Sequence, residues 1–112
     1  MPTIIYHNPK CSKSRATLEL LLEHGEDPKV VEYLNEPPSA DELEMILKKL
    51  GKKPAELLRK KEAQEEGVDA GLADGALIKA MVAHPRVIER PIVVKGAKAA
   101  VGRPPESVLD IL

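Results

Sequence analysis

The spacing of apolar residues changes along the chain and predicts the order of its first elements. Residues 3–6 form a short β-rich run that ends at a turn over residues 7–10. A helix is predicted over about residues 12–24, because its leucines recur at helical spacing on one face. Residues 30–34 form a second apolar run. A strand, a helix and a strand in this order form a right-handed unit, so we expect the two strands to pair in parallel.

The middle of the chain has the pattern of short helices. Ser39 followed by Glu42 is the signature of a capping box and opens a helix that runs to a glycine. Pro54 suits the first turn of another short helix. Residues 60–67 are rich in charged side chains, so we expect them to be solvated and assign them no chemistry. A further helix is predicted over about residues 75–83, where it is ended by a His-Pro pair.

The last third returns to β character. Residues 91–94 and 99–101 read as the two strands of a hairpin, and a short terminal helix follows them. The element order is therefore β-α-β, then helices, then β-β-α. With the helices of about residues 39–84 treated as an insertion, this is the order of a thioredoxin-like α/β fold. We expect one such domain over residues 1–112.

Composition narrows the classes of function. The 112 residues are 43% hydrophobic, with no Phe or Trp and two tyrosines, which predicts an aliphatic core. A formal charge of −1 and few aromatic residues argue against nucleic acid as a partner. Charges interrupt every apolar stretch before the roughly 18 residues of a membrane span, so no membrane partner is expected. One cysteine forms no internal disulfide, and with no export signal this favours the cytoplasm.

The single cysteine stands where a thiolate would be stabilised. Cys11 lies between the strand-ending turn and the start of a helix, where unpaired N–H groups favour an anion. Lys10, Lys13 and Arg15 add positive charge nearby, and His7 could assist when protonated. The alternative is a small buried hydrophobe, the usual state of a lone cysteine. Because the flanking residues are too polar for a core segment, we favour an exposed nucleophile with a lowered pKa.

Three arginines form a candidate anion site. Arg59, Arg90 and Arg103 each stand beside an element boundary, and two of them directly precede a proline. Guanidinium groups bind oxyanions through paired hydrogen bonds that lysine does not reproduce. The alternative is that they are ordinary surface arginines in weak ion pairs. A metal site is not expected, since one cysteine and three scattered histidines lack ligand spacing.

Five short sequence motifs follow one another along the chain. They are Tyr6-His7-Asn8-Pro9-Lys10-Cys11, Leu57-Leu58-Arg59-Lys60, His84-Pro85, Arg90-Pro91-Ile92-Val93-Val94 and Gly102-Arg103-Pro104-Pro105-Glu106. Together they resemble the glutaredoxin-dependent arsenate reductase family over essentially the whole chain. The short hairpin, and an end soon after the terminal helix, resemble its compact arsenate-reductase-like branch.

The resemblance implies a mechanism as well as a fold. It implies that Cys11 attacks arsenate held by Arg59, Arg90 and Arg103. Glutathione, a co-substrate rather than a bound cofactor, then attacks the arsenic adduct, and glutaredoxin resolves the mixed species so that arsenite is released. A covalent thiol adduct divides a difficult two-electron reduction into thiol exchanges.

The resemblance also assigns supporting residues around the thiol. In the family, the histidine matching His7 and the serine matching Ser14 help to tune the thiolate. Thioredoxin-like folds place a cis proline beside the active-site thiol, so we expect the Arg90–Pro91 peptide to be cis. We further expect the three arginines, which are remote in sequence, to lie around Cys11.

Two other functions remain open at this point. A general glutathione-linked thiol reductase would use the same Cys11 without an oxyanion pocket, so oxyanion binding distinguishes it. RNA-polymerase-binding regulators of the Spx type share the fold and often carry Cys-x-x-Cys as a redox switch. Here Ser14 occupies the second position, so such a regulator would lack the switch.

Overall fold

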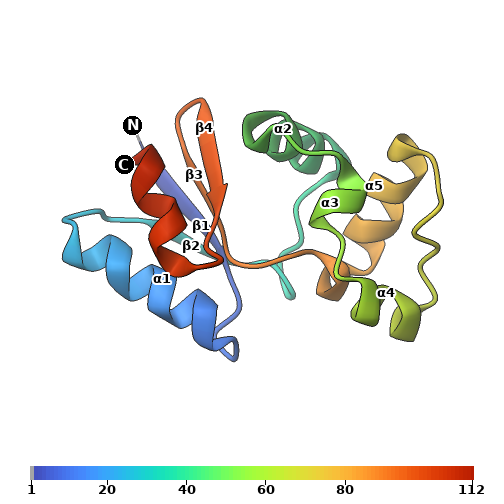
Figure 1. The fold of residues 1–112 in the computed structure, drawn as a ribbon, viewed down its shortest axis with the longest axis horizontal. Helices are drawn as coiled ribbons and strands as arrows, with labels where there is room; N and C mark the ends of the chain where they lie inside the picture. Colours follow the sequence, from blue (N-terminus) through green and yellow to red (C-terminus); the bar gives the residue numbers. More distant parts are fainter. Residues whose placement is uncertain (1) are drawn as a thin grey trace. The chain divides into compact units, whose positions relative to one another are not determined.

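A computed structural model describes residues 2–112 as a mixed α/β structure with one four-stranded sheet (Figure 1). In chain order the elements are β1 (Thr3–His7), α1 (Ser12–Glu23), β2 (Lys29–Glu32), α2 (Ala40–Leu50), α3 (Pro54–Leu57), α4 (Lys60–Glu66), α5 (Asp74–Ala83), the 3-10 helix η1 (Pro85–Val87), β3 (Ile92–Lys95), β4 (Lys98–Val101) and the 3-10 helix η2 (Pro105–Ile111). The chain divides into two compact units, residues 1–36 with 90–112 and residues 37–89. We call them the sheet unit and the helical unit.

The sheet unit has the topology expected from the sequence. Its strand order is β2-β1-β3-β4, with β1 parallel to β2 and antiparallel to β3. The β3–β4 pair is the expected hairpin, closed by a two-residue turn with Gly96 at φ 60°. Because β1 lies in the middle, its carboxyl end, where the cysteine turn begins, has a neighbouring strand on either side.

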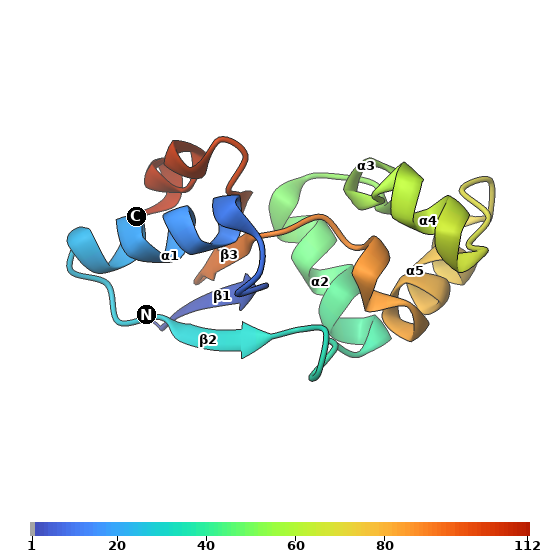
Figure 2. The same cartoon turned by 90° about the horizontal axis from the view of Figure 1, so that it is seen from below.

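The core of the sheet unit is aliphatic, as expected. Ile5 of β1, Leu21 of α1, Val93 of β3 and Val108 of η2 are fully buried against one another. Both α1 and η2 cover the same face of the sheet, as Figure 2 shows. This packing fixes the start of α1 relative to the ends of β1 and β4.

The second strand is shorter than expected. It ends at Glu32, whereas the apolar run predicted a strand to residue 34. The reason is a turn, since the backbone N–H groups of Asn35 and Glu36 both donate to the Glu32 carbonyl at 3.0 Å. Leu34 therefore lies in a loop and is 41% exposed.

The helical unit confirms the predicted helix signals. Ser39 Oγ accepts from the Glu42 N–H at 3.1 Å, and the Glu42 carboxylate closes the capping box on the Ser39 N–H. Helix α2 ends at Gly51, whose φ of 67° is left-handed. That the two units together act as one domain stays a prediction.

The expectation that residues 60–67 are solvated is confirmed for most of the segment but was wrong for Glu62 and Ala63, which are buried. Most of this segment forms α4, and Glu62 within it is only 7% exposed. Its carboxylate is held there by Arg59, whose Nε–H donates to Glu62 Oε2 at 2.6 Å. Burial of a carboxylate is tolerated when an opposite charge pairs with it, and such a pairing is not visible in a charge run.

Among the helices of residues 2–112, none has both the length and the apolar character needed to cross a membrane.

Candidate functional site

A tight turn between β1 and α1 presents Cys11. The Cys11 N–H donates to the Asn8 carbonyl at 3.0 Å, and the Lys10 N–H donates to Asn8 Oδ1 at 3.0 Å. Cys11 is the N-cap residue of α1, and its carbonyl accepts the first helical bond from the Arg15 N–H. Its side chain is only partly buried. The structure therefore places the thiol at the positive end of a helix and within reach of solvent, unlike a core cysteine.

Two of the three arginines lie beside the sulfur. Arg103 Nη2 donates to Cys11 Sγ at 3.6 Å, and Arg103 Nε donates to the Arg90 carbonyl at 2.8 Å. The Arg90 side chain also donates to the thiol. The Arg90–Pro91 peptide is cis, as expected, and so is the Arg103–Pro104 peptide. The segments before β3 and after β4 thus deliver one guanidinium each to the cysteine turn.

A glycine that sequence reasoning missed sets the position of Arg103. The Gly102 N–H donates to the Pro91 carbonyl at 2.9 Å, and the chain passes tightly against Thr17, which is fully buried on α1. A Cβ on Gly102 would lie 2.7 Å from Pro91 Cγ and would collide with Thr17 Oγ1. Only glycine allows this approach. The signal in the sequence was a glycine directly before an Arg-Pro pair.

The pKa of the Cys11 thiol lies below its ordinary value. Partial burial by itself raises this pKa, because it disfavours the charged form. That effect is outweighed by donors that stabilise the thiolate, namely the backbone amides of Ser14 and Lys13, the Arg90 side chain and the positive charge of Arg103. The helix start and the two arginines therefore act together on one sulfur atom.

We expect the rate of Cys11 alkylation by iodoacetamide to reach its plateau at a pH below that of a free cysteine, whose pKa is about 8.5. Only the thiolate reacts, so a lowered pKa moves the whole rate profile to lower pH. A pH series of stopped-flow or mass-spectrometric rates measures this directly, since the chain has one cysteine. Glutathione, alkylated under the same conditions, is the control. An inflection of the Cys11 rate profile at or above the pH found for glutathione would contradict the prediction.

His7 and Ser14 form a buried pair beneath the turn. His7 Nδ1 lies 2.6 Å from Ser14 Oγ, which also accepts from the Asn8 N–H at 3.0 Å. Burial lowers the pKa of His7, Glu32 raises it, and Arg15 lowers it, with a net decrease. The lowered pKa favours the neutral form of His7 at pH 7, and the expectation that His7 assists when protonated stays a prediction. Its structural connection to the thiol is through Ser14.

Arg15 and Arg59, the other two arginines that the sequence analysis singled out, have other partners. Arg15 Nη1 donates to the Pro9 carbonyl at 3.3 Å and so holds the cysteine turn from its outer side. Arg59 belongs to the helical unit, where its guanidinium pairs with Glu62 at 2.6 Å and with Glu89 at 2.7 Å. Two carboxylates thus neutralise Arg59 within its own unit. Its expected role in holding an oxyanion stays a prediction.

Comparison with known proteins places this site in a family. Residues 6–111 match the ArsC family. The chain belongs to the ArsC family. An arsenate reductase of Neisseria meningitidis (serogroup A) is 48% identical over the full length of both chains. The uncharacterized protein YfgD of Escherichia coli (strain K12) is 53% identical over 96% of this chain and 94% of its own.

Solved structures of ArsC relatives share the fold. A structure titled arsenate reductase from Vibrio cholerae superimposes with a TM-score of 0.93 at 48% identity, covering 100% of this chain and 98% of that one. The resemblance drawn from the motifs and the thioredoxin-like fold are both confirmed. The chain is thus an enzyme of the arsenate reductase family by homology.

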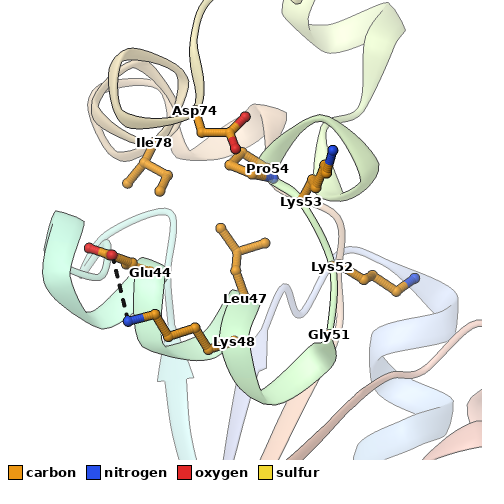
Figure 3. A pocket seen from close by; sticks show the side chains of 9 residues that line it. All are labelled: Glu44, Leu47, Lys48, Gly51, Lys52, Lys53, Pro54, Asp74 and Ile78. Atoms are coloured by element: carbon orange, nitrogen blue, oxygen red, sulfur yellow. Dashed lines mark ion pairs between the residues drawn. The ribbon is translucent and has the colours of Figure 1, made fainter.

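The helical unit carries a hollow of its own (Figure 3). It measures about 320 Å³ and lies between α2, the loop before α3 and α5. The apolar side chains of Leu47 on α2 and Ile78 on α5 face one another across it, while Lys48 pairs with Glu44 across one turn of α2 at 3.8 Å. Its lining holds no cysteine, serine or histidine. We assign this hollow no part in the thiol chemistry.

Proposed function

We propose that this ArsC protein reduces arsenate to arsenite through a covalent adduct on Cys11. The observation that carries the proposal is the pair of guanidinium groups at one partly exposed thiol, with Arg103 Nη2 3.6 Å from Sγ. A tetrahedral oxyanion requires such cations beside the nucleophile, because its negative charge otherwise repels the thiolate.

The arginines perform two tasks in this scheme. Before substrate binds, Arg90 and Arg103 stabilise the Cys11 thiolate. When arsenate enters, the same donors bind its oxygens, so charge repulsion between the two anions is offset. The thiolate then attacks arsenic, an S–As bond forms, and one arsenate oxygen leaves as water after protonation. His7 remains bonded to Ser14 and keeps the amide donors of the turn in place.

Reduction requires further thiols. A second thiol adds to arsenic and displaces another oxygen as water. A third thiol attacks that second sulfur, and the two sulfurs leave as a disulfide. The electron pair of the broken S–As bond stays on arsenic, which becomes As(III) and is released as arsenite on hydrolysis. We propose glutathione as the second thiol and glutaredoxin as the third, in a cytoplasm that keeps Cys11 reduced.

A coupled assay tests the function. Purified protein, arsenate, glutathione and glutaredoxin are combined, and arsenite is measured by mass spectrometry beside the oxidation of NADPH through glutathione reductase. We expect arsenite in proportion to NADPH consumed. Parallel assays replace arsenate with a glutathionylated peptide. Turnover of the peptide without any arsenite formation would instead support a general thiol reductase.

We expect multiple turnover to depend on both glutathione and glutaredoxin. The chain has a single cysteine, so it cannot resolve its own adduct by an internal disulfide. Omitting glutathione should stop arsenite release after at most one turnover, and omitting glutaredoxin should slow it strongly. Thioredoxin with its reductase serves as the comparison system. Full multiple-turnover activity with thioredoxin alone would contradict this prediction.

A further inference from the structure

A second hollow adjoins the cysteine turn within the sheet unit. It measures about 180 Å³ and is lined by residues from the carboxyl ends of β1 and β2 and the loops that follow them, including His7, Asn8, Lys10, Glu32, Leu34 and Asn35. The two strands are parallel, with His7 opposite Glu32 in register, so their following loops leave the same edge of the sheet. Lys10 directly precedes Cys11 in the chain. The hollow is therefore next to the turn that holds the nucleophile.

The inner wall of this hollow consists of polar groups that are held in place. His7 is 6% exposed and Asn8 is 8% exposed, so both side chains are more than nine-tenths buried. Each is fixed by one bond, from His7 Nδ1 to Ser14 and from the Lys10 N–H to Asn8 Oδ1. These two bonds leave the Asn8 NH₂ group and the His7 Nε2 atom unused. Buried polar groups of fixed orientation are typical of small-molecule sites.

The outer wall carries one charge of each sign. Lys10 and Glu32 are both exposed and both line the hollow, with the apolar Leu34 beside them. Lys10 suits an oxyanion, but the Glu32 carboxylate repels one. The hollow is therefore unsuited to a second arsenate. It suits a group that bears an ammonium and a carboxylate on the same carbon, which is the head of an α-amino acid.

We propose that this hollow binds the zwitterionic amino-acid head of the thiol peptide that attacks the Cys11 adduct. The ammonium of the peptide pairs with Glu32, and its carboxylate bonds to Lys10 and to the Asn8 amide. A volume of about 180 Å³ takes one residue-sized group, so the remainder of a peptide such as glutathione extends out of the hollow. The proposal rests on the proposed function in one respect, that a thiol peptide is the second thiol.

Kinetics with two thiols test this site. We expect Glu32→Gln to raise the KM for glutathione about fivefold, a modest factor because the carboxylate is exposed to solvent. The KM for arsenate and the pH profile of Cys11 alkylation should not change. With 2-mercaptoethanol, which has neither charge, the variant and the natural protein should be equal. Glu36→Gln, an exposed neighbour outside the hollow, is the matched control.

An equal rise in the KM of Glu32→Gln for both thiols, or no rise for either thiol, would overturn the proposed site. A binding measurement tests the proposed site independently of whether the protein reduces arsenate. S-methylglutathione, whose sulfur is blocked, is titrated by NMR into the natural protein and into Glu32→Gln in the absence of arsenate. Binding that weakens in the variant supports the site even if no arsenite is ever formed. Arsenite formation with no binding, or with identical binding, rejects the site and leaves the function standing.

Discussion

Replacing Cys11 with serine should reduce arsenite formation to below about one-thousandth of the natural rate, because it removes the nucleophile. A hydroxyl is far less acidic than the thiol, so the amides of α1 and the two arginines cannot produce an anion from it at neutral pH. The fold should remain intact. Cys11 is a partly exposed N-cap residue, and serine is among the preferred residues at that position. Arsenite release in the coupled assay measures the loss.

The Cys11→Ser protein also provides its own control. Circular dichroism and thermal unfolding should match or exceed those of the natural chain, since the cap is retained or improved. Arsenate should still bind, because Arg90 and Arg103 are unchanged. A serine variant that keeps most of its turnover would remove Cys11 from the mechanism.

Replacing Arg103 with lysine should weaken arsenate binding about tenfold or more. The Arg103 guanidinium donates to two places at once, through Nε to the Arg90 carbonyl and through Nη2 to the sulfur. Lysine has the charge but one compact donor group, so it cannot hold the backbone bond and face an oxyanion together. Each charge-assisted bond contributes about 1.5–3 kcal/mol, and 1.4 kcal/mol corresponds to a factor of ten. Calorimetric titration of arsenate into Cys11→Ser with and without the second change measures the loss.

Arg86→Lys is the matched control for this experiment. Arg86 is a surface arginine of the helical unit that pairs with Glu65 at 2.7 Å, and we place it outside the site. Its replacement should leave arsenate binding unchanged. Equal losses in the two variants would indicate a general effect of arginine content, and no loss in Arg103→Lys would remove that guanidinium from the oxyanion site.

Local sequence signals predicted the setting of the thiol. The turn after residue 7, the helix from Ser12 and the capping box at Ser39 each depend on residues within a few positions of one another. Such signals survive in the folded state because nearby backbone groups satisfy them. The parallel pairing of β1 and β2 followed from one connection rule and is also confirmed.

Interactions between distant residues were not predictable in this way. Arg103 and Cys11 are 92 positions apart, and no periodicity in the sequence indicates that their side chains lie in contact. The lowered pKa of His7 results from burial, which a polar flanking sequence does not reveal. The same holds for buried Glu62 and for the tight passage of Gly102 between Pro91 and Thr17. The motif resemblance, not the chemistry of single residues, predicted that arginines gather at the thiol.

The separation between the cysteine turn and its arginines also affects how the protein is made. A ribosome adds roughly 5–20 residues per second, so about 5–18 seconds pass between Cys11 and Arg103. During that interval β1 lacks its β3 partner, and neither guanidinium has been placed beside the sulfur. In the nascent chain the Cys11 thiolate therefore has at most the backbone amides at the start of α1 to stabilise it. The contribution of the two arginines is added only after Arg103 has been synthesised and the hairpin has paired with β1.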